Sequence, residues 1–119
     1  MPSLPEKLDL ALVKRLRQVV TGEVATESEL RTLAEQADGW ARATEAQLRA
    51  AETRLARLNA DPASELGDMA IELRRVEDLY AELEEARSLV AGLERRTREL
   101  RTAWLKHHAE ATPPLGGAA

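Results

Sequence analysis

The sequence predicts an all-α fold: a long antiparallel helical hairpin of coiled-coil character, with a short third helix at its N-terminus. Ala, Glu, Lys, Leu and Arg make up 73 of the 119 residues, a share typical of coiled coils and long helices. Apolar residues recur every three or four positions along three segments, and nowhere alternate as in a β-strand. We expect one helical domain over residues 1–111, with helices at 4–21, 27–59 and 62–109, and a disordered tail at 112–119.

The first predicted helix, residues 4–21, follows a capping box at residues 3–6 (SLPE), in which proline suits the first turn. Gly22 comes directly after the last residue of this predicted helix and is expected to end it as a C-cap. The apolar stripe of this helix consists of Leu8, Leu12, Leu16, Val19 and Val20.

The second predicted helix, residues 27–59, begins at a further capping box formed by Thr26 and Glu29. Its stripe keeps close to heptad spacing for four repeats, as in a coiled coil. Pro62 disfavours helical geometry at the residue before it and so ends the helix. The stripe consists of Leu30, Leu33, Ala37, Ala41, Thr44, Leu48, Ala51, Leu55 and Leu58.

The third predicted helix, residues 62–109, starts with Asp61 as N-cap and Pro62 in the first turn. Its stripe contains a one-residue shift at Ala86. Gly92, like Gly39 and Gly67, lies inside a predicted helix, where close approach of another helix or a bend would justify its cost. The stripe consists of Leu66, Met69, Leu73, Val76, Tyr80, Leu83, Ala86, Val90, Leu93, Thr97, Leu100 and Trp104.

The short break between the two long helices makes them antiparallel neighbours. We place Leu58 opposite Leu66, a register in which Thr44 faces Tyr80 and every stripe residue meets another. Several layers then set a small residue against a large one, as interdigitating cores do.

The place of the first helix follows from lengths. At about 1.5 Å per residue the third helix spans roughly 70 Å, the second roughly 50 Å and the first about 24 Å. The first and second helices laid end to end match the third. We therefore expect this layout, which brings Val20 and Val24 toward Leu100 and Trp104. The alternative is a first helix that folds back to make a short three-helix bundle.

The composition excludes several classes of function. No cysteine is present, so disulfides, thiolate metal sites and cysteine nucleophiles are ruled out. His107 and His108 diverge by about 100° on a helix and do not suit one metal ion. Neither a glycine-rich phosphate loop nor a Gly-x-Ser-x-Gly motif occurs. We expect no enzyme activity, no cofactor and no small-molecule substrate.

The sequence also bears on location. No apolar run of 18 residues occurs, so no membrane span is expected. The first residues lack a basic region followed by an apolar one, so a secretory signal is not expected either. We therefore expect a cytoplasmic protein.

Charge is distributed unevenly along the chain. The net charge of −4 argues against general nucleic-acid binding. Residues 61–85 contain nine acids and two arginines, whereas residues 86–108 contain six basic residues and two acids. This pattern suits a solvated surface, and it would also match acid to base between two hairpins side by side in opposite sense. The basic residues Arg87, Arg95, Arg98, Arg101 and Lys106 share one arc of the helix.

The predicted hairpin tip, residues 61–65 (DPASE), is followed by residues 72–75 (ELRR). This stretch is similar to the acidic coiled-coil tip of regulators that enter the secondary channel of RNA polymerase. The similarity covers residues 61–75 only, and the chain has no cysteine for the zinc-binding part that such regulators carry. The alternative function is therefore a transcription or nucleic-acid-associated regulator that uses this tip or the arginine stripe.

The leading functional expectation is a non-enzymatic protein-interaction module, such as an adaptor, a scaffold or a small accessory subunit. Ile71 and Leu89 lie off the predicted seam, five turns and about 27 Å apart on one side of the third helix. An apolar anchor with a charged rim is typical of interfaces, and we expect it to bind a protein partner or a second copy of the chain. Cover by the first helix, or isolated exposure, is the alternative. The rim consists of Asp68, Arg75, Glu85 and Arg96.

Overall fold

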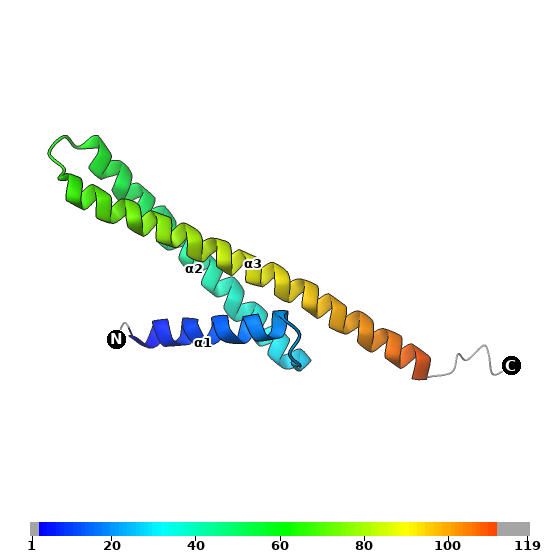
Figure 1. Cartoon of the computed structure of the whole chain (residues 1–119). Helices are drawn as coiled ribbons and strands as arrows, with labels where there is room; N and C mark the ends of the chain where they lie inside the picture. Colours follow the sequence, from blue (N-terminus) through cyan, green and yellow to red (C-terminus); the bar gives the residue numbers. More distant parts are fainter. Residues whose placement is uncertain (1–2, 112–119) are drawn as a thin grey trace.

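The computed structural model describes residues 3–111, with side chains for residues 10–109. Three helices follow in order: α1 (Ser3–Val20), α2 (Glu27–Ala60) and α3 (Leu66–Ala111). The long helices α2 and α3 pack side by side in opposite directions, and α1 lies against one side of them (Figure 1). This confirms the predicted hairpin with a short N-terminal helix, and residues 3–111 contain no strand. The side chains of the capping box at residues 3–6 and the tail at residues 112–119 lie outside what the structure describes.

The predicted C-cap at Gly22 is present, as is the Thr26 half of the predicted capping box. The N–H groups of Glu23 and Gly22 donate to the carbonyls of Gln18 and Val19, at 2.9 and 3.1 Å. These are the two bonds of a Schellman motif, and they place Gly22 in the left-handed region, at a φ of 120°. Thr26 begins α2, where its hydroxyl accepts a hydrogen bond of 3.0 Å from the N–H of a residue in the first turn, Glu29.

The tip of the hairpin is longer than predicted. Asp61 ends α2, and its carboxylate accepts a hydrogen bond of 2.9 Å from the Ala63 N–H, as in an Asx turn. α3 therefore begins at Leu66 rather than at residue 62. The predicted start is wrong because Asp61 uses its side chain in the turn and does not cap the next helix.

The longer tip changes the register of the two long helices. The Thr44 hydroxyl of α2 donates a hydrogen bond of 2.9 Å to the Glu82 carboxylate. In the predicted register Thr44 would instead lie opposite Tyr80. Arg54 forms an ion pair with Glu72 in the same displaced register. The predicted pairing is thus wrong by two residues, a consequence of the extra turn residues between the helices.

The seam of α3 also differs from the predicted stripe. Leu79 is buried, whereas Leu73 and Tyr80 are exposed. The observed seam steps by three and four residues without any shift, because Glu72 belongs to it. Because Glu72 is charged, the row of residues that contains it does not stand out as apolar in the sequence. The buried and half-buried seam residues are Met69, Glu72, Val76, Leu79, Leu83, Ala86, Val90, Leu93, Thr97 and Leu100.

The first helix folds back. α1 packs against both long helices over the half of the hairpin far from the tip, and its Leu16 and Val19 are fully buried there with Trp40 of α2. The end-to-end layout is therefore wrong and the three-helix alternative is confirmed. Val24 and Trp104, which the end-to-end layout would have brought together, are both exposed. Toward the tip the molecule is only two helices wide (Figure 1).

Candidate protein-interaction surface

The predicted anchor Leu89 is not on an outer surface. Its side chain is 9 % exposed and belongs to the core that α1 forms with α2 and α3. The expectation of an exposed Leu89 is wrong because α1 folds back over this side of α3. Part of the predicted surface thus exists, but a helix of the same chain covers it.

Two residues of the predicted rim take part in this docking of α1. The Arg17 guanidinium of α1 forms an ion pair with Glu85. Arg96 donates a hydrogen bond of 3.2 Å to the Gly22 carbonyl, just beyond the end of α1. Leu89, Glu85 and Arg96 therefore serve a contact within the chain.

The remaining predicted residues lie nearer the tip, beyond the reach of α1. Ile71 is 70 % exposed, and Asp68 and Arg75 are exposed beside it. A single exposed apolar residue is common on protein surfaces. A role of these three residues in partner binding stays a prediction.

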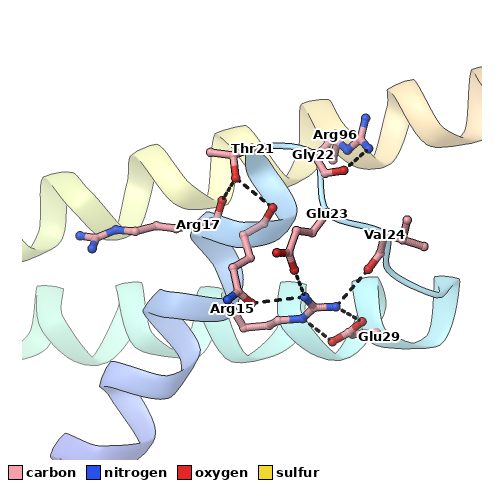
Figure 2. Close-up of polar contacts among 9 residues, drawn as sticks. Arg15, Arg17, Thr21, Gly22, Glu23, Val24, Glu29 and Arg96 are labelled. Atoms are coloured by element: carbon pink, nitrogen blue, oxygen red, sulfur yellow. Dashed lines mark hydrogen bonds and ion pairs between the residues drawn. The ribbon is translucent and has the colours of Figure 1, made fainter.

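Arg15 fastens α1 to the start of α2 (Figure 2). Its guanidinium donates two hydrogen bonds of 2.7 Å to the Glu29 carboxylate, and further bonds of 3.1 Å to Glu23 and to the Val24 carbonyl. The hydrogen bonds from Arg15 lower the pKa of Glu29, although partial desolvation opposes them. The same bonds raise the pKa of Arg15. Glu29 therefore serves the contact between helices rather than completing the predicted capping box.

The opposite side of α3 carries an open flank. α1 touches α3 at Glu85 and Gly92, and the residue Gly22 just after α1 contacts Arg96, all on one side of the seam. On the other side of the seam, residues spaced by three and four positions are all exposed. We call this surface the open flank; its main residues are Leu66, Leu73, Glu77, Tyr80, Glu84, Arg98, Arg101 and Leu105.

Four large apolar side chains stand on the open flank. Leu66, Leu73, Tyr80 and Leu105 are 82 %, 48 %, 53 % and 61 % exposed. Shallow grooves between α2 and α3 run along this side, one of them lined by Leu73 together with Leu55 of α2. The Tyr80 hydroxyl donates a hydrogen bond of 3.0 Å to Glu52 across the groove, and this bond raises the pKa of Tyr80.

The sequence analysis assigned three of these apolar residues to the seam. The signal that could have separated them was the one-residue shift at Ala86, which a seam containing Leu79 does not need. Trp104 was also assigned to the seam. It is exposed because α3 extends past the beginning of α2, and its ring stacks on His108 with centroids 4.7 Å apart.

The basic half of α3 is partly neutralised within the chain. Arg87 and Arg101 lie 3.6 Å from Glu45 and Glu27 of α2. Arg95 and Arg96 lie within 4.0 Å of Glu99. The described residues hold no cluster of three or more histidine or acidic side chains that could bind a metal ion. No helix in that part of the chain is sufficiently long and apolar to cross a membrane.

Comparisons with protein-family models, with curated proteins and with solved structures found no match to this chain.

Proposed function

We propose that the chain is a non-enzymatic protein-interaction module, an adaptor, scaffold or small accessory subunit, that binds another protein chain along the open flank of α3. The observation that carries this proposal is the exposure of Leu66, Leu73, Tyr80 and Leu105 on one side of one helix. Exposed apolar side chains in a row along one side of a helix, with charged groups between them, suit a surface where proteins meet.

The shape of the surface favours a helical partner. The open flank is straight, it belongs to a helix of 46 residues, and grooves accompany it between α2 and α3. An amphipathic helix of the partner would lay its apolar residues into such a groove at spacings of three and four. We expect this binding to occur in the cytoplasm, the compartment predicted from the sequence.

The charges favour protein over nucleic acid as the partner. Arginines that could follow a phosphate backbone already lie near glutamates of the same chain, as Arg87 and Arg95 do. The acidic half of α3 would repel a long duplex. The tip offers little for a transcription regulator, since Asp61 is engaged in the turn.

Site-specific photo-crosslinking in the native host tests the proposal. A photoreactive residue replaces Leu73, Tyr80 or Ile71, and Arg74, exposed between these two faces, serves as control. We expect Leu73 and Tyr80 to capture a protein chain, identified by mass spectrometry, and Arg74 to capture none. Capture at Ile71 alone would move the binding surface to the face predicted from the sequence. An absence of captured protein at all three positions would refute the interaction module.

A further inference from the structure

The open flank changes the sign of its charge along α3. Its first half bears Glu77 and Glu84, with Arg87 as an exception, and its second half bears Arg98 and Arg101, with Glu94 as an exception. Apolar side chains lie near both ends, Leu73 and Tyr80 in the first half and Leu105 in the second. When a second copy runs in the opposite direction, the acid Glu77 faces the base Arg101, and this pair carries the complementarity of the flank with its own reverse.

We infer that the partner on the open flank is a second copy of this chain, packed antiparallel through α3 about a two-fold axis. This inference rests on the proposed function, because it uses the same surface and names its occupant. When Leu73 of one copy faces Leu105 of the other, the helical repeat sets Glu77 opposite Arg101 and Tyr80 opposite Arg98. An arginine over a tyrosine ring adds a cation–π contact.

The geometry of the chain permits this pairing over the whole of α3. The pairing is centred at residue 89, close to the middle of the helix Leu66–Ala111. Both copies of α3, each about 69 Å long, then overlap from end to end. α1 does not obstruct the second copy because it occupies the other side of the seam. A two-fold contact uses the same surface on both copies and closes as a dimer.

Other arrangements fit the charges less well. A parallel copy would set Glu77 beside Glu77 and Arg101 beside Arg101, which costs energy when like charges meet at an interface. In the antiparallel dimer the one like-charged layer is Glu84 with Glu94. This exception provides a test of its own, because Glu94→Lys should tighten the dimer.

Cysteine crosslinking of the purified chain tests the orientation. The natural sequence has no cysteine, so each variant carries only the one introduced. We expect a mixture of Leu73→Cys and Leu105→Cys to form a mixed disulfide under mild oxidation, distinguished by chains of different tag length. Leu73→Cys alone should stay uncrosslinked, because the two copies of residue 73 would lie about 48 Å apart. The matched control is Ile71→Cys mixed with Leu105→Cys, which should not crosslink. Self-crosslinking of Leu73→Cys as efficient as that of the mixture would overturn the antiparallel dimer.

Charge exchange tests the pairing independently. Analytical ultracentrifugation should show that Glu77→Arg or Arg101→Glu weakens association about tenfold or more, with circular dichroism unchanged. Mixing the two variants should restore the dimer, because each introduced charge then meets its opposite. Equal association of both variants and the natural chain would contradict the inference. So would a purified chain that is monomeric while Tyr80 captures an unrelated protein in cells, an outcome that leaves the proposed function standing.

Discussion

Gly92 of α3 lies directly against Val20, the last residue of α1. A Cβ atom placed on Gly92 would be 3.0 Å from Val20 Cγ1 and 3.2 Å from Val20 Cγ2. The sequence analysis expected close helix approach or a bend at the helical glycines, and Gly92 confirms the former. Gly39 and Gly67 have no atom of the described residues within 4 Å of that position, so close approach does not explain them. The side chain of Val20 therefore occupies the space that a Cβ atom on Gly92 would need.

Gly92→Ala should consequently fail to give the stability that alanine normally brings to a helix. Alanine improves on glycine by about 1 kcal/mol within a helix. Here the added methyl must displace Val20, whose branched side chain has little freedom, and overpacking costs about 1–3 kcal/mol. We expect a net loss of about 1 kcal/mol in the free energy of unfolding, measured with urea at one protein concentration.

Gly39→Ala is the matched control, since nothing described crowds that position, and it should gain about 1 kcal/mol. Adding Val20→Ala to Gly92→Ala should cancel the steric penalty, so that the two changes are not additive. If Gly92→Ala stabilised the chain as much as Gly39→Ala, the close approach of α1 to α3 would be disproved.

The contact between Arg15 and Glu29 should make the docking of α1 sensitive to acid. Hydrogen bonds from Arg15 hold the pKa of Glu29 below its ordinary value, so the ionised form stabilises the folded state. This contribution is fully present above the ordinary pKa of about 4.3 and is lost as the pH falls through the lower folded value. Thermal unfolding of the natural chain and of Glu29→Gln should therefore converge below about pH 4 and diverge above it.

Glu35→Gln, on the same helix and exposed, serves as the control and should follow the natural chain at every pH. A constant difference in melting temperature between Glu29→Gln and the natural chain from pH 3 to 7 would show that the charge of Glu29 does not hold α1 in place.

The seam assignment can be tested by comparing two apolar residues of α3. Leu79 is buried between the long helices, so Leu79→Ala should lower the free energy of unfolding by about 2–5 kcal/mol. Ile71 is exposed, and Ile71→Ala should change it by less than about 0.5 kcal/mol. Chemical denaturation measures both. Similar losses for the two variants would place Ile71 in a core or in an interface, contrary to the observed seam.

The sequence predicted the elements of this fold better than their packing. Composition, the Thr26 cap and Gly22 were local signals, and each marked a helix or its end correctly. The direction of α1 depends on distant contacts, such as Val20 on Gly92 and Arg15 on Glu29. No local pattern encodes such contacts, and matching helix lengths led to the extended layout instead.

For the candidate surface, too, the sequence indicated the residue types but not the contacts between distant segments. Leu89 was recognised as apolar and off the predicted seam, but the helix that covers it comes from 70 positions earlier in the chain. Leu73 and Tyr80 were not recognised as surface residues. Their spacing from Val76 fits an apolar row of a helix as well as the spacing of Leu79 from Val76 does. The observed seam contains the charged residue Glu72, and this charge favoured the row of Leu73 and Tyr80 in the sequence analysis.

Glu72 itself leads to the last prediction. Its carboxylate lies in the seam, 11 % exposed, and pairs with the Arg54 guanidinium, which is 48 % exposed. Arg54→Ala leaves a nearly buried carboxylate without its partner and should cost about 1–3 kcal/mol. Glu72→Leu removes the desolvated charge and continues the apolar row, while Arg54 stays hydrated; we expect a gain of about 1 kcal/mol in the free energy of unfolding.

Urea unfolding of both variants and of the double variant Arg54→Ala with Glu72→Leu measures these changes. The double variant should be nearly as stable as Glu72→Leu alone, because Arg54 matters only as the partner of Glu72. If Glu72→Leu instead destabilised the chain as strongly as Arg54→Ala, the pair would stabilise the hairpin by more than its desolvation costs, and the acid would be a requirement of this register rather than an interruption of its core.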